Sequence, residues 1–169
     1  AEGVPLPPKM PDPGPVLTVA GNAPVRLRML AYRAARIAQR AGGHLYVSFP
    51  YPTRGTPDCE QWRTKAYLAV RNHTVVGYLV SRTTRAWGEA DLTRPELSID
   101  TQGHVDSKPR VDLVFVCADF RRQRIASSLV RAMAEDRGAS PQKLLWQAPF
   151  GVQGLGLVKK FNQHKVLVS

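Results

Sequence analysis

Cysteine is scarce in this sequence, and long apolar runs are missing. The two cysteines, Cys59 and Cys117, lie far apart, with no CxxC pair and no paired histidines near them. We therefore expect neither a disulfide nor a metal site. No stretch reaches the roughly 18 apolar residues of a membrane-spanning helix, and the N-terminus lacks the basic and apolar regions of a secretory signal. We therefore expect a soluble, cytoplasmic protein that does not bind membranes.

Acidic residues are also in short supply: 13 Asp and Glu stand against 24 Lys and Arg, for a net charge of +11. This surplus favours acidic proteins, nucleic acids or anionic carriers as partners. Part of this positive charge comes from arginines spread along one predicted helix, where they form a solvent-exposed face. Because the sequence has no zinc-finger spacing, RNP-like aromatic motif or helix-turn-helix pattern, a basic nucleic-acid-binding module is only the alternative interpretation.

The chain has 169 residues, of which 43% are hydrophobic, so it is long enough for one domain with a core. Six of its 14 prolines lie within the first 15 residues. Proline lacks an amide donor, so residues 1–22 are expected to form an extended arm without regular structure. A disordered tail is favoured over an arm packed on a neighbouring subunit. Residues 23–169 form the predicted domain.

Apolar periodicity and turn residues predict the elements of the first half. Apolar residues recur at helical spacing from Ala23 to Ala41. His44 to Phe49 alternates as a short strand does. The polar pair Asn72-His73 joins two β-rich runs, Lys65 to Val70 and Thr74 to Arg82, into a hairpin.

The second half is predicted in the same way. The stretch from Arg85 to Arg110 is expected to be an exposed excursion with a short strand at Glu96 to Asp100. After it we expect a helix at Ile125 to Arg137, a strand at Lys143 to Gln147, a helix at Val152 to Phe161 and a strand at His164 to Val168.

A buried strand, a basic turn and a helix start follow one another between Val111 and Leu129. The apolar run ending at Cys117 has the pattern of a core strand, and Arg121, Arg122 and Arg124 come just before the expected start of the helix at Ile125. Backbone amides at a helix N-terminus carry partial positive charge and favour anions. The segment is therefore a candidate phosphate-binding turn.

The run Arg121-Arg122-Gln123-Arg124-Ile125-Ala126 resembles the cofactor-binding signature of the GNAT superfamily of N-acyltransferases. Its first and sixth positions match, whereas the fourth holds Arg124 where family members usually have glycine. Val75-Val76-Gly77-Tyr78-Leu79 also resembles the hairpin that precedes this turn in the family. The resemblance implies an α/β fold with a mixed, mostly antiparallel sheet flanked by helices on both faces, and it covers about residues 24–168.

The resemblance further implies an N-acetyltransferase that uses acetyl-CoA as cosubstrate and transfers the acetyl group directly to an amine in a ternary complex. The amine could belong to a protein, a small molecule or a carrier. Backbone groups at the end of the strand would pair with the pantetheine, and the turn would bind the pyrophosphate. The implied cofactor-binding residues are Phe115, Val116, Cys117, Arg121, Arg122, Gln123, Arg124, Ile125, Ala126 and Ser127.

Asp112 is the candidate general base, because it falls where histone-type family members place a glutamate. A strand-end aspartate paired with Arg110 is the alternative, and other candidate bases are Glu89, Glu96 and Asp100. The tyrosine that many members carry on the last helix is absent. Phe161 cannot donate a proton, so the candidate acids are Ser127, Ser128, His164 or water. A degenerate domain that binds acyl-CoA without turnover also remains open.

Three further features have both a functional and a structural interpretation. Cys117 is interpreted as a small core residue rather than a nucleophile. The aromatic residues Tyr46, Phe49, Tyr51 and Trp87 could line the acceptor pocket or pack in the core. The segment Trp146 to Phe150, with Gly154 and Lys160-Phe161, resembles the C-terminal part of cohesin acetyltransferases, although Ala148 replaces their aspartate.

Overall fold

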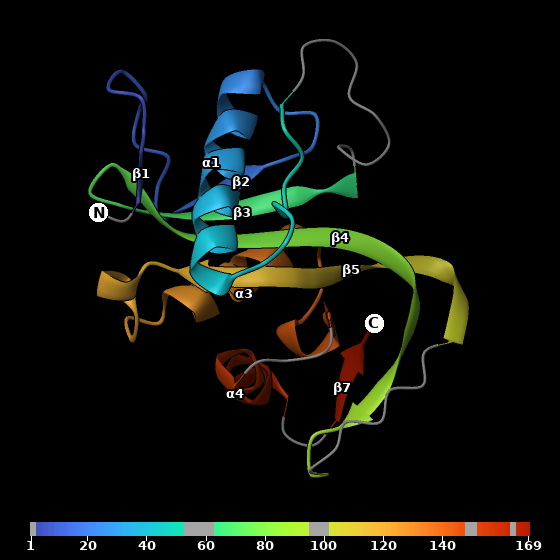
Figure 1. Cartoon of the computed structure of the whole chain (residues 1–169). Helices are drawn as coiled ribbons and strands as arrows, with labels where there is room; N and C mark the ends of the chain where they lie inside the picture. The colour runs from blue at the N-terminus through green and yellow to red at the C-terminus, as the bar shows by residue number, and fades with distance from the viewer. Residues whose placement is uncertain (1–2, 53–62, 95–101, 148–151, 163–164) are drawn as a thin grey trace.

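A computed structural model describes residues 3–52, 63–94, 102–147, 152–162 and 165–169. Within them one sheet has the strand order β2-β3-β4-β5-β6-β7, and β1 pairs with β4 (Figure 1). The strands are β1 (Val4–Pro5), β2 (Val16–Val19), β3 (Lys65–Arg71), β4 (Thr74–Asp91), β5 (Gln102–Val116), β6 (Leu145–Trp146) and β7 (Lys165–Val168). The helices are α1 (Val25–Gly42), α3 (Ile125–Asp136) and α4 (Val152–Phe161).

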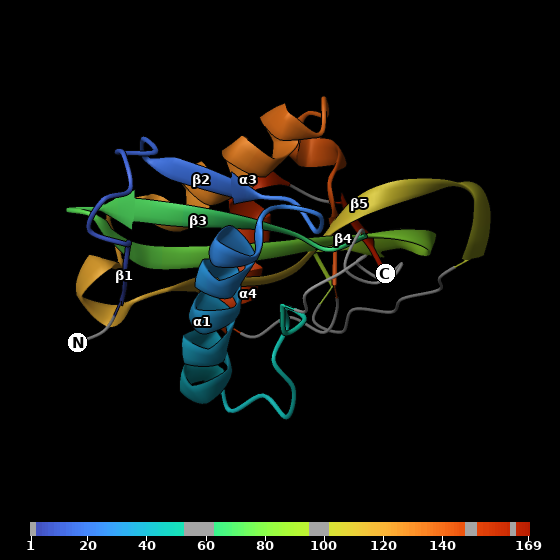
Figure 2. The same ribbon diagram turned by 90° about the horizontal axis from the view of Figure 1, so that it is seen from above.

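The helices lie on both faces of this sheet (Figure 2). Alternate residues of β3 point to opposite faces, so Leu68 packs in a cluster with α1 whereas Tyr67 packs in a cluster with α3 and α4. Among the strands of the described residues, only the pairs β5–β6 and β6–β7 are parallel. The predicted fold, a mixed and mostly antiparallel sheet between helices, is confirmed. Among the described residues, no helix is long and apolar enough to cross a membrane.

The hairpin and the three predicted helices are confirmed. Asn72 and His73 have φ angles of 50° and 59°, the left-handed backbone that a tight two-residue hairpin turn requires. Helix α1 ends where Gly43 takes φ 66°. Gly77 on β4 allows α3 to approach closely, because a Cβ there would lie 3.0 Å from Ile125 Cγ2 and 3.1 Å from Ala69 Cβ. This contact seats the start of α3 against the sheet.

The prediction that residues 1–22 lack regular structure is wrong for two segments. β1 pairs with β4, and β2 pairs along β3. Proline removes a donor but keeps its carbonyl, and the amide of Val70 donates to the Pro15 carbonyl (2.9 Å). Val4 and Leu6 are buried under α1. The arm is extended, as expected, but it belongs to the sheet and core.

Two other local predictions are wrong. His44–Phe49 is irregular and not a strand, and Phe49 is nevertheless buried. The stretch from Arg85 to Arg110 is mostly strand, because β4 and β5 continue as one long hairpin, and the far end of β4 pairs with β7. The strand expected at Glu96–Asp100 lies outside the described residues.

Asp136 ties the end of α3 to β3. Lys65 Nζ and the Tyr67 hydroxyl each lie 2.6 Å from Asp136 Oδ2. Partial burial acts to raise the pKa of Asp136, but the hydrogen bonds from Lys65 and Tyr67 outweigh it and hold this pKa below its usual value. Burial and the same hydrogen bond raise the pKa of Tyr67. The ionised carboxylate is therefore the form that the fold stabilises.

Asp136→Asn should lower the free energy of unfolding by about 1 kcal/mol at pH 7, because it replaces charge-assisted hydrogen bonds with neutral ones. The folded-state pKa is depressed, so the contribution is present above the unfolded-state pKa of about 3.9. It is lost as the pH falls through the folded-state value. Urea unfolding from pH 7 to about pH 2 should show the two proteins converge in acid. The neighbouring exposed Glu135→Gln is the control; an equal loss there would contradict this account.

Candidate functional site

A cavity of about 1680 Å³ runs along β5. Its walls come from the end of α1 and residues 44–48, from Arg82 on β4, from β5 itself, from the turn before α3 and the start of α3, and from β6 and α4. These segments are distant in sequence. The cavity therefore joins the candidate phosphate-binding turn to the candidate base within one site.

The cavity exists because β5 and β6 separate. They pair only at Arg110 with Leu145 and at Val111 with Trp146. The Cys117 amide donates to Val76 on β4 (2.8 Å), so by alternation the backbone groups of Val114 and Val116 face away from β4. That strand edge borders the cavity, and within the described residues its backbone groups other than the Val116 carbonyl are open to a ligand. Arg121 Nε donates to the Val116 carbonyl (3.1 Å).

The turn before α3 has an unusual backbone for its sequence. Arg122 and Arg124 have φ angles of 62° and 61°, in the left-handed region where glycine is favoured. Arg124, at the position where GNAT members usually have glycine, thus adopts the conformation that glycine would take there. Arginine in place of glycine at this position thus adds a side chain, while the backbone keeps the conformation that a glycine would allow.

The N-terminus of α3 presents free amides to the cavity. The helix has no side-chain cap and no acidic residue in its first turn. Its first hydrogen bond from within the helix is donated by Ser128 to the Arg124 carbonyl (3.0 Å), so the amides of residues 125–127 have no acceptor within the helix. With three arginines on the same turn, this arrangement fits a phosphate group.

Eight of the ten cofactor-binding residues expected from the sequence line the cavity: Phe115, Val116, Arg121, Arg122, Arg124, Ile125, Ala126 and Ser127. Gln123 and Cys117 do not. The Cys117 side chain is buried and borders a separate small space beside Ala34 of α1, as a core residue does. Cys59 lies outside the described residues. The structure therefore brings most of the expected set together, and its binding of CoA remains a prediction.

Asp112 lies in a β-bulge at the point where β5 leaves β6. Val80 pairs with Leu113 and Ser81 with Val111, which leaves Asp112 as the extra residue. Its side chain is 9% exposed and lines the cavity. Arg110 donates to both carboxylate oxygens, from Nε at 2.5 Å and from Nη2 at 3.2 Å. The alternative interpretation from the sequence, a pair with Arg110, is thus correct as geometry.

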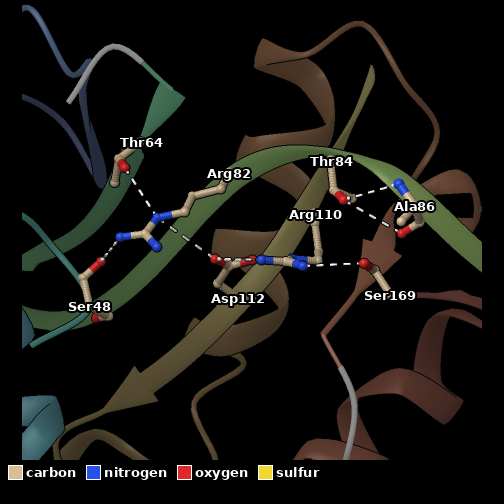
Figure 3. A network of polar contacts seen from close by, with 8 residues as sticks. All are labelled: Ser48, Thr64, Arg82, Thr84, Ala86, Arg110, Asp112 and Ser169. Atoms are coloured by element: carbon tan, nitrogen blue, oxygen red, sulfur yellow. Dashed lines mark hydrogen bonds and ion pairs between the residues drawn. The ribbon is translucent and has the colours of Figure 1, made fainter. Parts of the chain in front are cut away.

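Arg82 and Ser169 extend this pair into a network (Figure 3). Arg82 Nε lies 4.0 Å from Asp112 Oδ2 and donates to Thr64 Oγ1 at 3.2 Å. Arg110 Nη1 donates to Ser169 Oγ at 3.2 Å. Sequence reasoning missed Arg82, because only the bulge and the register of β4 and β5 place it beside Asp112. No local motif carries that information.

The other candidate acids and bases are placed less favourably or lie outside the described residues. Glu89 is exposed at the far end of β4, 3.6 Å from Lys165. Ser128 Oγ donates to the Ile125 carbonyl (2.8 Å) within its own helix. Ser127 is buried on the first turn of α3 and lines the cavity. Glu96, Asp100 and His164 are not described. Among the described residues, no group of His, Cys, Asp and Glu could hold a metal ion.

Only Tyr46 of the four aromatic residues named for the acceptor pocket lines the cavity. Phe49 is in the core. Tyr51 packs edge-on against Tyr32, with ring centroids 5.0 Å apart. Trp87 stacks on His104 at 3.8 Å. Phe49, Tyr51 and Trp87 therefore serve in packing and do not line the cavity. The cavity wall at residues 44–48 is an irregular segment.

This chain has the fold of the GNAT acetyltransferases. It is similar to the xEco2 acetyltransferase domain bound to a CoA conjugate, with a TM-score of 0.67, 20% identity and 91% of each chain covered. It is also similar to a ribosomal-protein-alanine N-acetyltransferase from Brucella melitensis biovar Abortus 2308, with a TM-score of 0.50, 21% identity, and 87% of this chain and 90% of that one covered.

A third similar structure is an aminoglycoside acetyltransferase from an uncultured soil metagenomic sample, in complex with sisomicin. Its TM-score is 0.52, at 14% identity, with 86% of this chain and 85% of that one covered. No family model matches the sequence, and none of the curated proteins matches it. At these identities the likeness establishes the fold, and function must be argued from the site.

The left-handed backbone at Arg124 predicts a difference between two substitutions. Arg124→Gly should have a free energy of unfolding about 1 kcal/mol higher than Arg124→Ala, because only glycine takes this φ without strain. The same pair at Arg131, inside α3, should differ in the opposite direction by a similar amount. Denaturant unfolding of the four variants measures both differences. An alanine variant at residue 124 as stable as the glycine variant would rule out the strain.

Proposed function

We propose that this chain is an N-acetyltransferase that moves an acetyl group from acetyl-CoA directly to an amine. One observation carries the proposal. A single cavity combines an anion-binding turn, an open strand edge and a carboxylate, which are the parts that thioester binding and amine attack need. The similar fold of acetyltransferases, one of them bound to a CoA conjugate, supports the same reaction class.

The residues of the turn and of β5 have separate roles in this proposal. The amides of residues 125–127 and the guanidinium groups of Arg121, Arg122 and Arg124 bind the pyrophosphate. The open edge at Val114 and Val116 pairs with the pantetheine amides. Arg121 must leave the Val116 carbonyl for that pairing, and it is then free to bind a phosphate. Bound in this way, acetyl-CoA supplies the acetyl group as a thioester.

Asp112 acts as the general base in this arrangement. A carboxylate has about four lone-pair sites, and Arg110 occupies two of them. The remaining sites can accept a hydrogen bond from the amine and then its proton without breaking the pair with Arg110. Arg110 thus holds the carboxylate in one orientation. The leaving thiol ordinarily has a pKa near 8.5, so water suffices as the proton donor when no tyrosine is present on α4.

Calorimetric titration with acetyl-CoA tests the cosubstrate, with a short DNA duplex at the same ionic strength as the comparison. We expect saturable one-to-one binding of acetyl-CoA. Salt-sensitive DNA binding without an acetyl-CoA signal would overturn the proposal, because the basic turn would then bind a nucleic-acid backbone.

Arg121→Glu and Arg124→Glu should each weaken acetyl-CoA binding by about tenfold or more, because each replaces a charge-assisted hydrogen bond with repulsion. Calorimetry measures the affinities, and circular dichroism checks that the fold is intact. Arg26→Glu is the matched control, since Arg26 is exposed on α1 and does not border the cavity. Unchanged affinity in both turn variants would exclude the turn as the phosphate site.

Asp112→Asn should lower kcat by about a hundredfold or more, because a general base is lost, while acetyl-CoA affinity changes little. Steady-state rates across pH measure the effect. Asp106→Asn on the exposed part of β5 is the matched control. A variant at residue 112 with the parent rate and pH profile would place the base elsewhere.

A further inference from the structure

The charges around Asp112 point to the kind of amine that this site accepts. Two guanidinium groups, from Arg82 and Arg110, face one carboxylate, so the three groups together carry one net positive charge. All three line the cavity: Arg110 and Asp112 lie on β5 ahead of the phosphate-binding turn, and Arg82 lies beside them on β4. An ammonium group that approaches Asp112 alone therefore meets a site that is cationic overall.

Arg82 differs from Arg110 in having donor capacity left. Arg110 is engaged by both oxygens of Asp112 and by Ser169. Arg82 uses Nε toward Thr64 and Nη2 toward the Ser48 carbonyl (3.5 Å), and its Nη1 has no acceptor among the described residues. The Arg82 side chain is 37% exposed and borders the cavity. The Arg82 guanidinium is thus positioned by Thr64 and Ser48, is partly desolvated, and can bind one more anion.

We propose that the acyl acceptor carries a carboxylate close to its amine, and that Arg82 binds this carboxylate while Asp112 receives the amine. This inference rests on the proposed function and names its substrate class. Arg82 Nε is 4.0 Å from Asp112 Oδ2, so the two positions are adjacent. They suit the amine and carboxylate of an amino acid, an acidic N-terminus, or a lysine next to an acidic residue. A guanidinium recognises such a carboxylate through paired N–H donors.

The same geometry disfavours polycationic acceptors. A second ammonium group near Arg82 would replace attraction with repulsion in a partly buried place, where charges are poorly screened. The arginines of the turn add to the positive potential of the cavity. Arg82 is therefore a specificity-determining residue, and its loss should change which amine is preferred more than how fast a neutral amine reacts.

The test uses three pairs of amines, each a carboxylate and its amide: β-alanine and β-alaninamide, amidated Asp-Ala and Asn-Ala, and acetylated, amidated Asp-Lys and Asn-Lys. Rates of CoA thiol release from acetyl-CoA give kcat/KM for each. In at least one pair the wild-type protein should prefer the carboxylate by about tenfold to a hundredfold, the range of a charged hydrogen bond. Sisomicin serves as the polycationic probe and should react more slowly than the preferred carboxylate.

Arg82→Gln should reduce this preference to near one, and differences in amine basicity cancel because the same pair is compared in both proteins. Arg82→Lys keeps the charge and should retain part of the preference, which covers the case in which glutamine destabilises the fold. Arg85→Gln is the matched control: it removes a charge from the same strand, but Arg85 contacts Ser107 and does not line the cavity. It should leave the preference unchanged.

Two outcomes overturn the inference: no pair with a carboxylate preference, or a preference that survives in Arg82→Gln. NMR of the arginine Nε groups can also follow binding of the six amines to the free protein, which extends the test to amines that bind but do not react. If the two members of every pair bind equally, or if none of them binds, the inference is also wrong. Acetyl-CoA binding without carboxylate preference would leave the proposed function standing. Absence of acetyl-CoA binding would remove the proposed function itself.

Discussion

The parting of β5 from β6 is the constraint on which the rest of the site depends. These strands share only two residue pairs, and the separation begins next to the bulged residue Asp112. At Arg110 and Val111, β5 is held between β4 and β6. Beyond them, one edge of β5 has no strand partner among the described residues and opens onto the cavity. The unpaired backbone N–H and C=O groups of a strand edge ordinarily pair with another strand. A short edge inside a cavity therefore suits a ligand whose amide groups can form the same hydrogen bonds.

The bulge and the arginine pair together determine what Asp112 can do. A bulge redirects one side chain without ending the strand, and here it turns a carboxylate into the cavity at the start of the open edge. Arg110 then fixes that carboxylate through two donors. In the proposed role of Asp112 as the general base, a carboxylate held in this way needs no reorganisation before it accepts a proton, which is how positioning lowers an activation barrier. The same arrangement leaves the three groups with a net positive charge, on which the proposed selection among amines depends.

Local signals predicted the fold well where one segment determines its own structure. The Asn72-His73 turn, the helical periodicity of α1 and the basic turn before α3 are all readable within short windows. Failures arose where tertiary pairing decides. The prolines of residues 1–22 suggested no regular structure, yet the Pro15 carbonyl accepts a hydrogen bond from Val70 on β3. The bulge that brings Arg82 to Asp112 depends on the register of β4 and β5, which no short window encodes.

The backbone conformation of Arg124 supports the proposal that the turn between β5 and α3 binds phosphate and does more than link these two elements. Two non-glycine residues of this turn, Arg122 and Arg124, adopt the left-handed backbone, and each does so at a cost in stability. Glycine at residue 124 would remove this cost in stability, because the backbone there already has the left-handed conformation that favours glycine. Strained residues of this kind persist mainly where the side chain or the exact backbone path serves a ligand. At the uncapped start of α3, beside a third arginine, the proposed binding of phosphate by the Arg124 guanidinium would compensate for the strain and account for both the conformation and the residue.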